Sequence, residues 1–412
     1  MRDNQQEINN NAFNDSAEEF ESIDLDGGAE YAENDQEYPD DGNYADDDYD
    51  APRRLPILHF AILGIIAVLV ITGMVKLILW NRGSDSGFDP NAVDTESVSV
   101  EVQDFIVPMT ADKLAGHEDD GVTTILLLGG NPITDDLSET GIAAQIEKLA
   151  AETLEAEAAE AGSQTANAQK NADETSETVR VIPAAFPNAR VTCLSREYDP
   201  STQEGREDIY NFFYVAYSIS SGNFDGQNFV ATTREEPVYT ESAETLTNLD
   251  YNDVDIIAVM YDDSDYRTLA PAYNGDTTDL SSFAGSLKSG IRMIQEAYPH
   301  IRIVFLSPTY RPYIDEKGNE QNPATTDLGN GEVVGYNAYA YMMCSETGIS
   351  YIDNFSGSVN ALNYERFVDK DGRLNEDGRY EVAKHFVTKI IADDLSEYRP
   401  PAAISIEDVE IE

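Results

Sequence analysis

Basic residues are scarce in this chain. Its 412 residues include 78 Asp and Glu but only 26 Lys and Arg, so the formal net charge is -52 and the isoelectric point is near 4.1. Nucleic-acid binding relies on clustered Lys and Arg, and this composition therefore argues against a nucleic-acid partner. A charge of this sign favours solubility and repulsion from anionic surfaces.

Cysteine and histidine are scarce as well. Cys193 and Cys344 could form one disulfide outside the cell, but two thiols do not establish one, and neither has metal-ligand spacing. A serine hydrolase needs a base beside its nucleophile, normally a histidine held by a carboxylate. Only four histidines are available for that role, namely His59, His117, His300 and His385.

The acidic residues are dense at the N-terminus. Residues 1–52 contain Arg2 as their only basic residue and few residues that could build a core. This composition predicts a disordered acidic tail. Tyrosines among the acids could serve as a docking strip for a cytoplasmic protein partner, and a plain solvated tail is the alternative.

One long apolar run follows the tail. It extends from Leu55 to Trp80, about 26 residues, which is enough to cross a hydrocarbon layer ~30 Å thick with some tilt. It lies too far into the chain, and is too long, for a cleavable signal peptide. We therefore expect residues 53–82 to form a single membrane-spanning helix. Basic residues flank it almost evenly, and we place the N-terminus in the cytoplasm and the large domain outside the cell.

Residues 83–120 are interpreted as a stalk, and beyond them short apolar runs alternate with helical patterns. The helix expected in residues 281–299 has Phe283, Leu287 and Ile291 on one face. The alternation predicts an α/β domain over residues 121–396, with a mostly parallel sheet covered on both faces, before an acidic tail over residues 397–412. The predicted strands are residues 124–128, 190–194, 254–261, 301–307 and, more weakly, 349–353.

Residues of about 140–178 look like an insertion into this domain. The segment is dominated by Ala and Glu, begins as a good helix former and becomes polar low-complexity sequence after Gly162. Because such a helix has little apolar face to bury, we expect a surface helix with a flexible end.

Ligands of parallel α/β sheets bind at the carboxyl ends of the strands, so chemistry is expected in the loops that follow them. These loops read GGNPITDD from Gly129, YDDSDY from Tyr261, SPTYRPY from Ser307 and DKDGRLNEDG from Asp369.

The loops resemble the catalytic blocks of the SGNH, or GDSL, hydrolase superfamily. That superfamily has a flavodoxin-like, three-layer α/β fold and contains serine esterases and acyl transferases acting on lipid, carbohydrate and peptidoglycan esters. Its first block, Gly-Asp-Ser with a following Thr, is matched by Gly129 and Thr134, but Gly130 and Asn131 replace the Asp and the nucleophilic Ser. The resemblance spans about residues 121–392.

Two further blocks of the superfamily are altered in the same way. In the block that supplies an oxyanion-hole Asn, Asp265 is kept, but Asp262 replaces the Gly and Ser264 replaces the Asn. In the last block, Asp371 is kept and Arg373 lies where the histidine is expected.

None of the four histidines falls in a strand-end loop, so a Ser-His pair is hard to assemble. We therefore predict a catalytically degenerate binding or scaffolding module of the cell envelope, without a cofactor or metal, whose ligand is an envelope carbohydrate or lipid ester. The degenerate-site positions are Asn131, Ser264, Asp265 and Asp371. The candidate ligand-binding residues are Gly129, Gly130, Thr134, Asp262 and Arg373.

Two alternatives keep the protein an enzyme. One is an active esterase or O-acetyl hydrolase or transferase with a rearranged catalytic set, such as Ser264 with Asp265. The other is a metal-dependent transferase in which Asp263 and Asp265 hold a divalent cation, since hard cations take oxygen ligands.

Overall fold

The computed structural model describes residues 101–108, 121–162, 179–193 and 202–403. The acidic tail over residues 1–52 and the apolar run from Leu55 to Trp80 lie outside these ranges. Within the ranges, no helix combines the length and the apolar character needed to cross a membrane. The membrane span and its orientation therefore stay predictions from the sequence.

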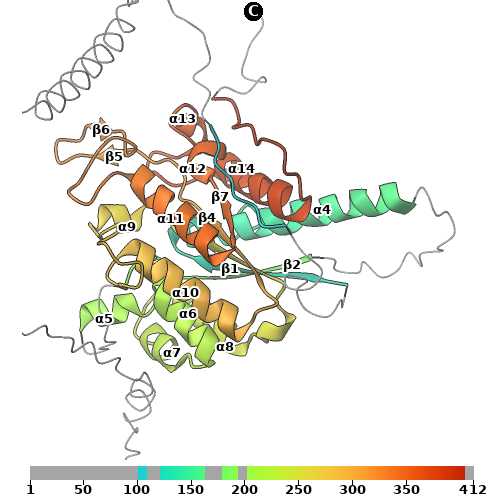
Figure 1. Ribbon diagram of the computed structural model, residues 1–412, viewed down its shortest axis with the longest axis horizontal. Helices are drawn as coiled ribbons and strands as arrows, with labels where there is room; N and C mark the ends of the chain where they lie inside the picture. The colour runs from blue at the N-terminus through green and yellow to red at the C-terminus, as the bar shows by residue number, and fades with distance from the viewer. Residues whose placement is uncertain (1–100, 109–120, 163–178, 194–201, 404–412) are drawn as a thin grey trace, which may run out of the picture. The chain divides into compact units, whose positions relative to one another are not determined.

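The centre of the fold is a parallel sheet of five strands in the order β2-β1-β3-β4-β7 (Figure 1). All four pairings between neighbouring strands are parallel. This is the doubly wound order of flavodoxin-like folds, in which the chain leaves β1 toward one edge and later returns to continue toward the other. The strands are β1 (Thr123–Gly129), β2 (Val179–Ala185), β3 (Ile256–Met260), β4 (Arg302–Leu306) and β7 (Ser350–Ile352).

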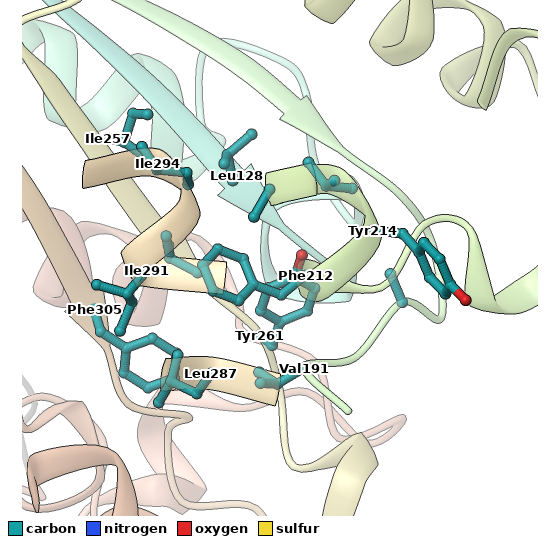
Figure 2. Packing of buried hydrophobic residues seen from close by; sticks show 14 of the residues in the cluster. Leu128, Val191, Phe212, Tyr214, Ile257, Tyr261, Leu287, Ile291, Ile294 and Phe305 are labelled. Atoms are coloured by element: carbon teal, nitrogen blue, oxygen red, sulfur yellow. The ribbon is translucent and has the colours of Figure 1, made fainter. Parts of the chain in front are cut away.

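Helices cover both faces of the sheet, because the side chains of each strand alternate between two hydrophobic clusters. Leu126 and Leu128 point into the cluster that includes α6 (Phe212–Ser221), α10 (Phe283–Ala297) and α11 (Val333–Thr347). Ile125 and Leu127 point into the cluster formed with α4 (Ile142–Gly162) and α14 (Glu376–Phe386). Figure 2 shows the first cluster, where Phe212 of α6 lies among Leu287, Ile291 and Ile294 of α10. The predicted α/β class with a parallel sheet is confirmed.

The layers contain six principal helices among the described residues, and short elements connect them to the strands. The principal ones are α4 (Ile142–Gly162), α6 (Phe212–Ser221), α8 (Pro237–Asn248), α10 (Phe283–Ala297), α11 (Val333–Thr347) and α14 (Glu376–Phe386), which a π-helical turn, η2 (Val387–Ile391), continues. Short elements fill the connections: α3 (Asn131–Thr134), α5 (Gln203–Asp208), α7 (Asp225–Ala231), η1 (Tyr251–Asp253), α9 (Ser264–Arg267), the hairpin β5 (Tyr313–Ile314) and β6 (Glu320–Gln321), α12 (Asn354–Gly357) and α13 (Tyr364–Phe367).

Helix α4 has a larger role than the sequence suggested. It is the crossover between β1 and β2, and it packs against β2 and α14. Ile142, Ile146 and Ala150 are fully buried, so a narrow apolar stripe over its first turns suffices to attach the helix to the sheet. The Ala- and Glu-rich segment is therefore not only a surface insertion. Its polar residues 163–178 lie outside the described ranges.

The strand predicted at residues 190–194 was wrong, and the true edge strand, β2, was missed. The chain turns after β2 at Asn188, which has a positive φ of 60°. Backbone N–H groups of the following segment bond side chains instead of another strand: Val191 and Thr192 donate to Asp265, and Cys193 donates to Ser286. A segment can thus be buried beside the sheet without joining it.

Side chains occupy the free edge of β2. The Val181 N–H donates to Glu147 Oε2 at 2.8 Å, and the Ser242 hydroxyl donates to the Ala185 carbonyl at 2.8 Å. Pro183 lies between these residues and has no N–H to offer.

The opposite edge, β7, is covered by residues 101–108. Phe105 and Tyr351 exchange both backbone hydrogen bonds, at 2.9 and 2.7 Å, in an isolated antiparallel bridge. The buried Arg302 donates to the Val107 carbonyl at 3.1 Å and to Ile390 at 3.0 Å, joining this segment to η2.

Candidate functional site

The loops after β1 and β3 meet at the point where the sheet order reverses, which is where doubly wound folds bind ligands. Gly129 ends β1 with its backbone against β3, and a Cβ at this position would lie 1.8 Å from the Met260 carbonyl oxygen. A Cβ on Gly130 would lie 2.9 Å from the Ala189 carbonyl oxygen. The two glycines are therefore required by packing, which allows the next residue, Asn131, to start α3 beside the end of β3.

Asn131 is fixed by hydrogen bonds on both sides of its amide. Its Nδ2 donates to Asp262 Oδ2 at 3.0 Å, and its Oδ1 accepts the Asn188 N–H at 2.9 Å. The lone pair of an amide nitrogen is delocalised into the carbonyl, so this side chain is no nucleophile even with a base beside it. The SGNH resemblance places the attacking Ser at this position. The Asn131 side chain instead connects its own loop to the loops that contain Asp262 and Asn188.

Asp262 is the common partner of this group. It accepts hydrogen bonds from the hydroxyl and the N–H of Ser264, and Arg311 Nη2 lies 3.6 Å from its Oδ2. Asp263, next to it, forms ion pairs with Arg311 and with Arg267, the latter at 2.7 Å. Although burial lowers the pKa of Arg311, Asp263 and Asp262 together raise it above its usual value. The carboxylates of the site are thus neutralised by guanidinium groups.

Asp265 points away from Ser264 and into the protein. It is buried, and its two carboxylate oxygens accept the N–H groups of Val191 and Thr192, both at 2.9 Å. Burial raises its pKa, an effect that these hydrogen bonds oppose. Successive residues at the start of a helix point in different directions, and here Ser264 faces Asp262 whereas Asp265 holds the segment after β2.

A small, shallow pocket of about 30 Å³, partly open to solvent, lies in front of Asn131. Arg373 is the most exposed cation of its wall, with 59% of its side chain accessible, and its Nε lies 3.7 Å from Asp135 Oδ1. Burial raises the pKa of Asp135, while Arg373 acts in the opposite direction. The pocket is lined by Asn131, Pro132, Asp135, Asp262, Asp263, Thr309, Arg311, Gly372, Arg373 and Leu374.

The remaining predicted residues lie around this pocket without lining it. Thr134 donates from its hydroxyl to the Gly130 carbonyl within α3, at 3.5 Å. Asp371 is exposed in a turn in which Asp369 accepts its N–H and that of Arg373. The structure therefore brings Asn131, Asp262, Ser264 and Arg373 to one place, and it separates Asp265 from them.

Neither histidine of the described ranges lines the pocket. His300 precedes β4 and so lies at the amino end of a strand. His385 is fully buried in α14, with Nε2 2.9 Å from Asp104 Oδ2 and Nδ1 3.2 Å from the Ser358 hydroxyl. Its ring stacks on Tyr398 at 3.7 Å between centroids. His385 therefore connects the segment over residues 101–108 to α14, and the fully buried Ser358 is closed to a substrate.

Asp263 and Asp265, the candidate metal ligands, do not share a site, since the first pairs with arginines and the second with backbone N–H groups. Among the described residues, no group of three or more His, Cys, Asp or Glu side chains is arranged to hold a metal ion. Cys193 and Cys344 are both buried, and no disulfide joins them.

No protein-family model and no curated protein matches the chain. Solved structures do. The carbohydrate acetylesterase family member from Sinorhizobium meliloti has 13% identity and a TM-score of 0.34, with 66% of this chain and 100% of that chain covered.

Two further solved structures that are similar to this chain are described as lipases. The lipase/acylhydrolase from Enterococcus faecalis is 12% identical, with 66% of this chain and 97% of that chain covered and a TM-score of 0.33. A Bacteroides ovatus protein described with the words GDSL-like lipase is 11% identical, with 65% and 97% covered and a TM-score of 0.34. These descriptions belong to those proteins, and they assign no activity to this chain.

Sequence reasoning missed several residues of the site. Arg311, Thr309 and Asn188 were not proposed, although the first two belong to the SPTYRPY loop that follows β4. A basic residue in a strand-end loop of so acidic a chain was the available signal for Arg311. Nothing in the sequence indicates that Asn188 donates to Asn131, because the turn after β2 was not predicted.

Proposed function

We propose that this chain is a membrane-anchored protein of the cell envelope whose α/β domain binds a ligand at the altered site and does not hydrolyse it. The observation that carries the proposal is Asn131, which occupies the position of the attacking Ser with its amide engaged by Asp262 and the Asn188 N–H. The pocket in front of it keeps hydrogen-bond donors and acceptors, which suits recognition of a polar ligand.

The ligand class that we propose is an ester or hydroxyl-rich carbohydrate of the envelope. Arg373 presents guanidinium donors at the rim, while Asp135 and Thr309 offer oxygen atoms in the wall. The apolar run from Leu55 to Trp80 would hold this domain at the outer surface of the membrane, in the orientation expected from the sequence analysis. The acidic residues 1–52 would then be available to a cytoplasmic protein partner.

The absence of esterase activity is the first expected result. The full-length chain in detergent, incubated with acetyl and longer-chain nitrophenyl esters, should give no turnover above the buffer rate, and a fluorophosphonate probe should leave it unlabelled. The reason is that Ser264 bonds Asp262, a weak base, and that neither histidine of the described ranges lines the pocket. Turnover that disappears in Asn131→Ala or Asp371→Ala, or a label on Ser264, would contradict the proposal and favour the rearranged esterase.

Ligand binding should depend on the rim cation. Arg373→Ala is expected to weaken binding of O-acetylated envelope glycan fragments about tenfold, since a hydrogen bond to a charged group contributes about 1.5 kcal/mol. Arg292→Ala, an exposed arginine on α10 outside the pocket, is the matched control and should bind like the parent. Calorimetric titration of the full-length chain measures both. If the parent and Arg373→Ala bind the glycan fragments with equal affinity, the pocket is not the site that recognises them.

A further inference from the structure

A second pocket lies away from the altered site, against the edge of the sheet. It is bounded by residues 101–103, by one side of α11 and by the end of β7 with the start of α12, and its volume is about 280 Å³, part of it open to solvent. None of the ten residues that line it is shared with the pocket in front of Asn131. It is therefore a separate cavity.

Aromatic rings form much of its wall. Tyr341, on the outer side of α11, keeps 37% of its surface exposed and meets the buried Tyr351 edge to face, with centroids 5.7 Å apart. Phe355, which is 9% exposed, contributes from α12. Aromatic faces of this kind attract the apolar stem of a ligand and, through their quadrupoles, a cation as well.

The polar part of the wall is made of hydrogen-bond acceptors. Asp353 is 5% exposed, and its two oxygens accept the N–H groups of Gln103 and Ser356 at 3.2 and 3.0 Å. Asn337 also lines the cavity, and its Oδ1 is buried without a hydrogen-bond partner among the described residues. Glu101 adds an exposed carboxylate at the rim.

Within the described part of the chain, no Lys or Arg lines this cavity. Behind it, Asp104 accepts hydrogen bonds from the His385 ring and from the Asp353 N–H, so the His385 imidazole is already paired. Burial raises the pKa of Asp353, and the neighbouring Asp104 acts in the same direction. The cavity is thus an acceptor-rich, negatively charged space with aromatic walls, and no cation of the described residues lines it.

We propose that this cavity binds an organic ammonium group carried on a short apolar stem. The N–H donors of the ammonium would reach the Asp353 and Glu101 carboxylates and the unsatisfied Asn337 oxygen, while the stem lies against Tyr341 and Phe355. A lysine side chain of a partner protein and a free alkylamine share this chemistry. The inference stands independently of the ligand proposed for the altered site.

Titration of the full-length chain in detergent with Nα-acetyl-lysine amide and with n-butylammonium tests the proposal. The matched neutral probes are Nα-acetyl-norleucine amide and n-butanol. We expect both ammonium compounds to bind at least about tenfold more tightly than their neutral counterparts, because a desolvated cation–carboxylate contact with aromatic neighbours is lost in the latter. Tighter binding of the lysine amide than of butylammonium would indicate a protein-borne ligand, and the reverse order a free amine. Equal binding of charged and neutral probes overturns the proposal.

Variants locate the binding. Asp353→Asn should weaken ammonium binding about tenfold, and Tyr341→Leu about threefold, in line with the strength of cation–π contacts at exposed sites. Because Asp353 also caps α12, Glu101→Gln at the rim is a second test that leaves the fold intact, with a loss of about threefold expected. The controls are Tyr380→Leu, equally exposed on α14, and Glu316→Gln in the exposed hairpin. Pocket variants that bind like these controls would place the ammonium elsewhere and refute the assignment.

Discussion

Replacing Gly129 by alanine is expected to lower the free energy of unfolding by about 3 kcal/mol, the upper end for overpacking in a protein interior. The added Cβ would lie 1.8 Å from the Met260 carbonyl oxygen and 2.8 Å from Ile133 Cδ1. The first of these atoms belongs to the backbone of β3, which is held in the ladder with β1 and cannot rotate away. Denaturant titration of the parent and the variant measures the difference.

Gly335→Ala is the matched control for that variant. Gly335 lies in the first turn of α11, and no atom lies within 4 Å of the position that its Cβ would take. Alanine is the better helix former by about 0.8–1 kcal/mol, so this substitution should leave stability unchanged or raise it slightly. A Gly129→Ala protein as stable as Gly335→Ala would mean that β1 and β3 can separate at their carboxyl ends without cost. The close approach of the two strands would then not be what positions Asn131.

Asp265→Asn is expected to destabilise the protein by about 3 kcal/mol. Both carboxylate oxygens accept backbone N–H groups of the buried segment after β2, and the amide NH₂ of Asn would face one of those donors instead. An unsatisfied buried N–H costs about 1–3 kcal/mol, and hydrogen bonds to a charged acceptor are the stronger kind. Thermal unfolding and urea titration should agree on the loss.

Asp377→Asn is the control for that substitution. Asp377 is exposed in the first turn of α14, where a negative charge contributes about 0.3–1 kcal/mol through the helix dipole. If Asp265→Asn cost no more than this control, Asp265 would not be the anchor of residues 191–192. The rearranged esterase, in which Asp265 serves Ser264, would regain support, so the variant also bears on function.

The central strands of the fold could be predicted because they are continuous apolar runs buried on both faces. β1, β3, β4 and β7 were each located within a few residues. β2 could not be found by the same signal: Val179–Ala185 contains an exposed Arg180 and a proline, as an edge strand tolerates. Residues 190–194 took its place in the prediction, although side chains of distant elements bind the N–H groups of residues 190–193.

The location of the site could be predicted from the sequence, but most of the hydrogen bonds and ion pairs between its residues could not. Strand ends and family blocks led to Asn131, Asp262 and Arg373, which lie around one pocket. The direction of each side chain depends on local helix geometry. The sequence therefore did not show that the adjacent Ser264 and Asp265 point in different directions. Long-range contacts such as Arg311 with Asp263 or Asn188 with Asn131 join loops that only the folded sheet brings together.

The two margins of the sheet limit how partners can approach this protein. Glu147, Pro183 and Ser242 leave little of the β2 edge for another strand, and Phe105 bridges the outer side of β7. Recognition by strand addition, a common way for one protein to capture an extended peptide, therefore has no open ladder at either of these edges. A partner of the described domain has to be recognised through side chains, by inserting a group into a pocket or by covering a helix face. For a chain of net charge -52, groups that bring positive charge have the advantage in that encounter.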